Sequence, residues 1–331
     1  MSIATTRSLL LRFFWGMLAS SAASTPLMAL AADPYPNNPV RLIVPTQPGG
    51  SVDIVGRLVA IELSKRLGRQ VIVDNRGGAG GIIGVDLAAK ANPDGYTLVL
   101  ANGTQSIQPA LQPLPYEPVK SFTPIAKIGI AALALVVHPS IPANSVKELI
   151  SLAKRKPGEL NFVGTGSGAM AHMATELFKI MADINFLIVQ FKSAGPGVVD
   201  LVGGHSHAMV GTIASVLPHI RSGRLKVLGT SGTRRSVVLP DVPAISEAGL
   251  AGYEAVNWYG IFAPAGTSPA IVDRLNRELR VILVSDEMKK MFLNDALEVD
   301  YLGPSEFGAF FARDMEQWAR VIKRANITLK E

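Results

Sequence analysis

Short apolar runs alternate with segments of helical periodicity in the first hundred residues. Val40–Val44, Val71–Val73 and Thr97–Leu100 have the length and the β-branched or aliphatic composition of strands. From Ser51 to Gly68 an apolar position recurs every three or four residues, as on one face of a helix. Strands that alternate with helices predict βαβ units and a mainly parallel sheet.

The same alternation continues through the rest of the chain. Leu133–Val137, Phe186–Val189 and Leu225–Leu228 are further strand candidates, and Ser145-x-x-Glu148 is a capping box that predicts a helix start. Two longer helices are expected in the C-terminal third, the first beginning at Ser268-Pro269. The second carries an apolar stripe whose spacing indicates burial in the core: Phe307, Phe310, Phe311, Trp318 and Ile322. No low-complexity linker divides the chain, so we expect two α/β halves with a ligand cleft between them.

The first 31 residues have the pattern of a secretory signal peptide. Arg7 and Arg12 lie in a short n-region without acids, an apolar stretch runs from Phe13 to Ala19, and Ala29-Leu30-Ala31 fits a cleavage site. The stretch is shorter than the ~20 residues that span a bilayer, which argues against an uncleaved anchor. We therefore expect export to a bacterial periplasm, with cleavage near Ala31.

Composition and charge narrow the function classes further. The chain has 331 residues, 48% of them apolar, which is enough for a sizeable core and about two domains. Removing residues 1–31 lowers the formal net charge from +6 to +4, and the dispersed lysines and arginines do not indicate a nucleic-acid partner. The sequence has no cysteine, which excludes a disulfide scaffold, a thiol nucleophile and a cysteine-ligated zinc site.

Two glycine-rich segments each lie between a predicted strand and a predicted helix. The first is Pro45–Asp53, with Gly49, Gly50 and a serine, Ser51, that is placed to cap the helix. The second is Gly164–Gly168, before the helical stretch that begins at Ala169. A helix N-terminus presents unpaired N–H groups and a partial positive charge, so each segment is either an anion site or an ordinary turn. One such loop in each half favours a small carboxylate or dianion held between them.

Enzyme and metal motifs are mostly missing. We find no Walker A loop and no G-x-S-x-G elbow, and no nucleophile–base pair is visible. His205-x-His207 would place both rings on one face of a strand, but no carboxylate cluster lies nearby in the sequence, so no metal site is expected. His172, on the helix after the second loop, is either a structural residue or a ligand contact, with the structural role preferred.

Several strings resemble those of the Bug solute receptors, the extracytoplasmic binding proteins of tripartite tricarboxylate transporters. Pro45–Asp53 resembles the family's P-F/Y-x-P-G-G-x-x-D loop, and Asp74–Gly81 resembles E-N-R-P-G-A-G-G. Pro93–Leu98 matches P-D-G-Y-T-L, and Leu114–Lys120 is similar to L-P-Y-D-P-V-K. Leu239–Pro243, Trp258–Gly260 and Phe262–Thr267 follow in the family's order. The resemblance covers essentially the whole mature chain.

The resemblance implies a type II periplasmic-binding-protein fold, in which two α/β lobes close on a small organic carboxylate. Residues 32–128 with 236–331 would form lobe one, and residues 129–235 lobe two. Asp53 would orient its loop rather than touch an anion, since like charges repel. The resemblance implies these ligand-binding candidates: Thr46, Gln47, Gly49, Gly50, Ser51, Asp53, Thr104, Thr165, Gly166, Ser167, Gly168, His172, Phe191, Ser193 and Thr212.

Departures from the family pattern concern the ligand. Thr46 stands where the family usually has an aromatic ring, and Gln47 adds an amide beside it. Ala169 and Met170 stand where hydroxyl residues are common, and Gly211-Thr212 replaces a common D-N. We therefore hypothesise a carboxylate that is larger or more apolar than the simple dicarboxylates.

The expected protein is a non-enzymatic, monomeric receptor without cofactor or metal. Its partners would be a small organic carboxylate and the membrane permease subunits of a tripartite tricarboxylate transporter. An orphan or sensory carboxylate receptor remains open, and an exported hydrolase is the alternative of another class.

Overall fold

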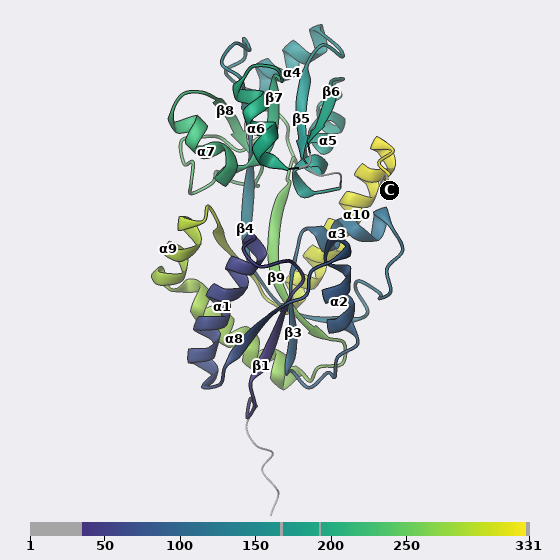
Figure 1. Cartoon of the computed structure of the whole chain (residues 1–331), viewed down its shortest axis with the longest axis vertical. Coiled ribbons are helices and arrows are strands. Elements are labelled where there is room, and N and C mark those ends of the chain that lie inside the picture. The colour runs from purple at the N-terminus through teal and green to yellow at the C-terminus, as the bar shows by residue number, and fades with distance from the viewer. Residues whose placement is uncertain (1–34, 166–167, 192, 329–331) are drawn as a thin grey trace, which may run out of the picture. The chain divides into compact units, whose positions relative to one another are not determined.

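The computed structural model describes residues 35–165, 168–191 and 193–328 (Figure 1). The strands are β1 (Val40–Val44), β2 (Val71–Asn75), β3 (Thr97–Asn102), β4 (Phe122–Val137), β5 (Asn161–Thr165), β6 (Leu187–Phe191), β7 (Ala208–Thr212), β8 (Lys226–Thr230), β9 (Val256–Pro264) and β10 (Glu298–Leu302). The helices are α1 (Ser51–Leu67), η1 (Ala79–Gly81), α2 (Ile82–Ala89), α3 (Thr104–Leu111), α4 (Val146–Arg155), α5 (Met170–Ala182), α6 (Ala194–Val202), α7 (Ile213–Arg221), α8 (Pro269–Val284), α9 (Asp286–Asn294) and α10 (Pro304–Ala325).

The strands join in one sheet, and β4 holds its two groups together. The first group has the order β2-β1-β3-β9-β4 with β10 also on β4, and the second has β4-β7-β5-β6 with β8 also on β4. Within β4, residues from Phe122 to Ala132 pair with β9, whereas Leu133–Val137 pair with β7 and β8. The sequence predicted only this last third of β4 as a strand.

Strand direction differs from the prediction of a mainly parallel sheet. Parallel pairing holds for β1 with β2 and β3, and for β5 with β6 and β7. The centre is antiparallel, because β9 runs against β3 and β4, and β4 runs against β7, β8 and β10. An apolar run shows that a segment is a buried strand but says nothing about its direction. The strands β7, β9 and β10 were not predicted.

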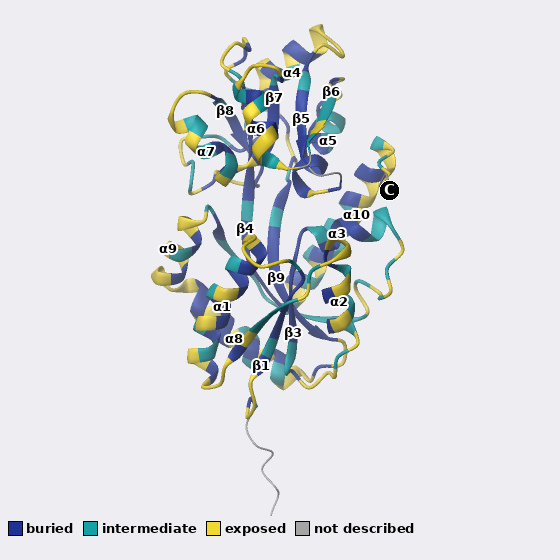
Figure 2. Ribbon diagram, in the orientation of Figure 1, coloured by how far each residue is buried: buried dark blue, intermediate teal, exposed yellow. Residues whose placement is uncertain are grey.

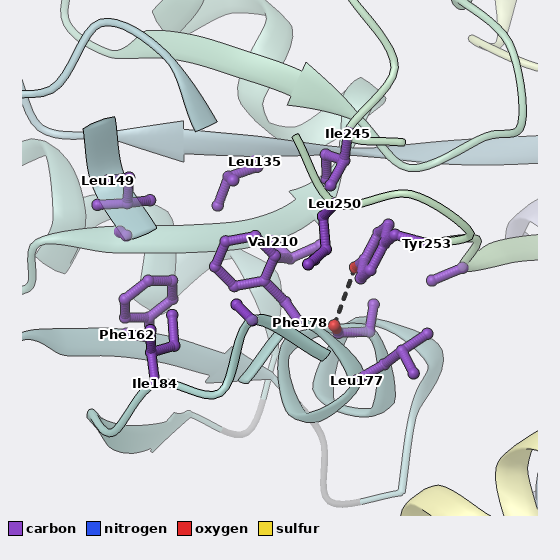
Figure 3. Close-up of a cluster of buried hydrophobic side chains, with 14 of the residues drawn as sticks. Leu135, Leu149, Phe162, Leu177, Phe178, Ile184, Val210, Ile245, Leu250 and Tyr253 are labelled. Atoms are coloured by element: carbon purple, nitrogen blue, oxygen red, sulfur yellow. Dashed lines mark hydrogen bonds between the residues drawn. The ribbon is translucent and has the colours of Figure 1, made fainter. Parts of the chain in front are cut away.

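The core follows the two-residue period of the central strands. Leu133, Leu135 and Val137 of β4 lie in one apolar cluster, with Phe162, Phe178 and Tyr253, as Figure 3 shows for part of it. The intervening Ala132, Ala134 and Val136 lie in a separate cluster. Alternate residues of a strand point to opposite faces, so β4 stabilises both faces of the second strand group.

The last helix confirms the predicted apolar stripe. Phe307, Phe311, Trp318 and Ile322 of α10 are buried and Phe310 is partly buried. Figure 2 shows that this helix has both buried and exposed positions. Gly260 of β9 allows this packing, because a Cβ there would lie 2.2 Å from Phe307 Cζ.

The predicted helix starts are mostly confirmed. Ser145 is the N-cap of α4, and its hydroxyl accepts a hydrogen bond from the Glu148 N–H. In a capping box the Glu148 carboxylate would accept a hydrogen bond from the N–H of the cap residue, Ser145. Here it accepts instead from the N–H of the preceding residue, Asn144, at 2.7 Å. Helix α8 begins at Pro269 after Ser268, as predicted. Among the described residues, no helix is both long enough and apolar enough to cross a membrane.

Candidate ligand-binding site

The first glycine-rich loop connects β1 to α1, as predicted. The N-cap of α1 is Gly50, so the prediction that Ser51 caps the helix is wrong. Ser51 is instead the first helical residue and is exposed, and its Oγ accepts a hydrogen bond of 3.0 Å from the Tyr259 hydroxyl. Its side chain is held by β9 rather than by its own helix.

Asp53 holds the backbone of this loop. Its buried carboxylate accepts from the Gly49 N–H at 2.9 Å and from Asn75 Nδ2 at 3.0 Å. Burial raises the pKa of Asp53, but hydrogen bonds from Arg57, Gly49 and Asn75 outweigh that effect and hold the pKa below its ordinary value. These contacts agree with the expectation that Asp53 orients the loop.

The second loop lies between β5, which ends at Thr165, and α5, which begins at Met170. Gly166 and Ser167 lie outside the described residues. The Gly168 N–H donates to His172 Nδ1 at 3.1 Å, and both residues are buried. Burial lowers the pKa of His172, which keeps the ring neutral and its Nδ1 free to accept. The contact supports the structural role for His172.

The two loops are held by the same kind of hydrogen bond, from a glycine N–H to a side chain in the first turn of the following helix. Gly49 and Gly168 each precede the N-cap residue, and Asp53 and His172 are each the third residue of the helix that follows. Both glycines have positive φ, +91° and +75°, which favours glycine. In each loop the third helical side chain accepts the glycine N–H. This bond fixes the loop just outside the first helical turn, whose N–H groups have no partner within the helix.

The other described candidates lie at or next to the carboxyl ends of strands. Thr46 and Gln47 follow β1, Thr104 begins α3 just after β3, and Thr165 ends β5. Phe191 ends β6, Ser193 is the N-cap of α6, and Thr212 ends β7. Since β1 is parallel to β3, and β5 is parallel to β6 and β7, the candidates gather at one edge of each strand group.

The two edges meet at Gly103 and Met170. A Cβ at Gly103, before α3, would lie 2.5 Å from Met170 Cε, at the start of α5. Met170 is one of the residues that depart from the family pattern, and its side chain is buried. Met170 therefore lies between the carboxyl end of β3 and the second loop.

Asn257 and Tyr259 on β9 were missed by the sequence analysis. Tyr259 donates to Ser51, and Asn257 Nδ2 donates to the Tyr259 hydroxyl at 3.1 Å. Asn257 Oδ1 accepts from the Gly103 N–H at 3.2 Å. The Trp258–Gly260 string had been noted only as a family motif. The sequence signal for these two residues is the amide of Asn257 and the hydroxyl of Tyr259 in an otherwise apolar strand, where buried polar groups need hydrogen-bond partners.

Histidines provide no metal centre in the described part of the chain. No group of three potential ligands occurs among those residues. The prediction that His205 and His207 share a face of a strand is wrong, because both precede β7. His207 Nδ1 instead accepts from the Asn161 N–H at 2.8 Å.

Comparison with known proteins decides the family. The model of the tripartite tricarboxylate transporter family receptor matches residues 55–327. The chain belongs to this receptor family. It is 35% identical over 316 residues to protein BugT of Bordetella pertussis, covering 95% of this chain and 96% of the relative. The family assignment confirms the resemblance seen in the sequence, and its members are periplasmic receptors.

Solved structures of this receptor family share the fold. A TctC solute-binding protein from Polaromonas is 28% identical, with a TM-score of 0.81 over 88% of this chain and 99% of its own. A structure from R. palustris with adipate is 31% identical, with a TM-score of 0.72 over 89% and 99% of the two chains. MatC from Rhodopseudomonas palustris with bound malate is 30% identical, with a TM-score of 0.68 over 87% and 100%. These similarities confirm the α/β fold of a periplasmic binding protein.

Proposed function

We propose that this receptor captures a small organic carboxylate between two lobes and delivers it to a tripartite-type membrane permease. Lobe one is taken as residues 32–128 and 236–331 and lobe two as residues 129–235, although the segment from Ile245 to Ala255 packs in the core of lobe two. Ligand closes the lobes by hinge bending, and the closed form docks on the permease. The adipate and malate in related structures support a carboxylate as the ligand class.

The observation that carries this proposal is the matched hydrogen bond in the two glycine loops, from Gly49 to Asp53 and from Gly168 to His172. Each lobe holds a glycine loop against the N-terminus of a helix through one side chain, Asp53 in lobe one and His172 in lobe two. Unpaired N–H groups of a first helical turn bind anions, and the aligned peptide dipoles add a partial positive charge. A ligand with two polar ends fits two such helix starts.

The two helix starts differ in charge. Asp53 is ionised and lies in the first turn of α1, where its charge pairs with Arg57 Nη2 at 3.0 Å, whereas neutral His172 occupies the same position of α5. The start of α5 therefore presents its partial positive charge with no carboxylate in its first turn. The α1 end contributes hydroxyl and N–H donors around Ser51, which suit a second carboxylate, a carbonyl or a hydroxyl group.

The departures indicate a more apolar ligand than succinate or malate. Met170 places a thioether at the meeting point of the two edges, and Thr46 replaces a ring with a smaller side chain. We propose a carboxylate with an apolar segment between or beside its polar groups. Tight binding of malate in preference to adipate and to aromatic acids would contradict this part.

A carboxylate panel tests the function. We would measure melting temperature and calorimetric affinity of the mature protein with malate, succinate, adipate, citrate and benzoate. Ligand at about 100 times its dissociation constant should stabilise the fold by roughly 2.7 kcal/mol. Chromatography of each mixture should show the acid unchanged, since we propose binding without turnover. Absence of binding to every acid would refute carboxylate capture, and product release would favour the hydrolase.

Export is tested separately. We propose that residues 1–31 direct the chain to the periplasm and are removed there. Mass measurement of the protein from a periplasmic extract should give a chain that starts at Ala32. A full-length chain in the membrane fraction would contradict cleavage.

A further inference from the structure

We propose that Asn257 and Tyr259 form a one-way hydrogen-bond relay that directs the hydroxyl hydrogen of Ser51 toward a bound carboxylate. The relay runs from the Gly103 N–H to Asn257, from Asn257 to Tyr259, and from Tyr259 to Ser51. The inference rests on the proposed carboxylate-binding function, and it assigns positioning roles to two residues outside the candidate loops.

The first step fixes the orientation of the Asn257 amide. The Gly103 N–H is shared between Asn257 Oδ1 at 3.2 Å and the Trp258 carbonyl at 3.1 Å. If the amide were rotated, its NH₂ group would face that N–H, and two donors would oppose each other. Oδ1 therefore faces Gly103, and Nδ2 must point to Tyr259, 3.1 Å from its hydroxyl oxygen.

The second step fixes the direction of the Tyr259 hydroxyl. Tyr259 is fully buried, and its oxygen already accepts a hydrogen from Asn257. Ser51 Oγ, at 3.0 Å, is the acceptor left for the phenolic hydrogen among the described residues. Burial raises the pKa of Tyr259, so this hydrogen stays in place at physiological pH.

The last step determines what Ser51 offers to a ligand. A hydroxyl has one hydrogen, and Ser51 Oγ uses a lone pair to accept from Tyr259. Its own hydrogen is free to point into solvent, and the residue is exposed at the start of α1. Ser51 is thereby set as a donor beside the N–H groups of the first helical turn. Such a donor site binds carboxylate or carbonyl oxygens, and it disfavours an amine or an amide NH₂ group at the same place, because two donors would face each other.

A double-mutant cycle tests the relay. The variants are Ser51→Ala, Tyr259→Phe and the pair, with Tyr301→Phe as a matched control, because Tyr301 donates a similar 3.0 Å bond to Asn276 away from the loops. The probe is each acid of the panel above that binds the unaltered protein. Ser51→Ala should weaken its binding about 10-fold or more, since it removes a hydrogen bond to a charged group. Tyr259→Phe should weaken binding about 5-fold in the native background and have no further effect in the Ser51→Ala background.

Asn257→Asp reverses the relay without changing its shape. The introduced carboxylate, once ionised, still accepts from the Gly103 N–H but cannot donate, so it draws the Tyr259 hydrogen away from Ser51. Binding should weaken by more than with Tyr259→Phe. The part of the loss due to the relay should vanish in the Ser51→Ala background, whereas simple charge repulsion would persist there. Tyr301→Phe should leave the affinity unchanged.

The outcomes separate the relay from the proposed function. If acids bind but Ser51→Ala leaves their affinity unchanged, the relay is overturned while carboxylate capture stands. Equal losses from Tyr259→Phe in both backgrounds would show that Tyr259 acts through packing, which also overturns the relay. If no acid binds the unaltered protein, carboxylate capture fails and the relay fails with it. A melting temperature for each variant without ligand identifies any loss that comes from misfolding.

Discussion

Replacing His172 should make the second loop both less stable and less sensitive to pH. His172 Nδ1 accepts the buried Gly168 N–H, and the ring lies in a buried position on α5. His172→Leu replaces the ring with an apolar side chain of similar size and removes the Nδ1 acceptor. His172→Asn offers an oxygen near the position of Nδ1 and removes the titration, so it serves as the matched control.

The loss of stability in His172→Leu follows from the Gly168 N–H, which is left buried without an acceptor. A buried donor left without a partner costs about 1–3 kcal/mol, whereas the Asn variant should lose mainly ring packing. For a chain of this length, each kcal/mol lowers the melting temperature by roughly 2 °C. We therefore expect His172→Leu to melt about 2–6 °C below the unaltered protein at pH 8, with His172→Asn between them.

The pH dependence has a definite sign. Burial lowers the pKa of His172 in the folded state, so the unfolded chain takes up the proton first as the pH falls. Its contribution is fully present above the unfolded pKa of about 6.5 and is lost as the pH falls toward the folded-state value. Glu176 Oε1 lies 3.8 Å from His172 Nε2, but burial raises the pKa of Glu176 as well, which weakens its pull on a protonated ring.

Differential scanning calorimetry from pH 5 to pH 8 measures both effects. The gap in melting temperature between the unaltered protein and His172→Leu should narrow below about pH 6.5, because only the unaltered protein loses stability when this histidine is protonated. A gap that stays constant across the range would refute the neutral-acceptor role. So would a Leu variant as stable as the Asn variant at pH 8.

Three further substitutions probe the first loop, the core and the ligand. Asp53→Asn should destabilise the fold by about 1–3 kcal/mol at pH 7 in urea titration. Because the folded-state pKa of Asp53 is lowered, that difference should disappear as the pH falls through it, below about pH 4. Gly260→Ala should cost about 3 kcal/mol in urea titration, since its Cβ would meet the Phe307 ring, and a neutral result would contradict this packing. Met170→Ser removes the thioether beside Gly103 and should shift preference toward malate over adipate by about tenfold in calorimetry; an unchanged ratio would place Met170 away from the ligand.

Local patterns predicted the loops but not what holds them. Glycines between an apolar run and a helical period identified both strand–helix connections, and the buried face of α10 could be read from its spacing. The partner of the Ser51 side chain could not be predicted, because Tyr259 reaches it from 208 residues away. The direction of β9 was equally hidden, since it depends on how the chain returns from its second half.

Strand β9 is where packing and binding chemistry meet. Tyr259 belongs to the apolar cluster of the first strand group, yet its hydroxyl reaches the loop before α1. Asn257 pairs with Ala131 of β4, two residues before β4 changes its partner from β9 to β7. In a receptor whose lobes close by bending near this crossing, the relay would begin at the bend and end at the ligand. A substitution that shifts β9 against β4 should therefore change affinity through the Tyr259 contact with Ser51, while the Gly168–His172 bond of the second loop stays in place.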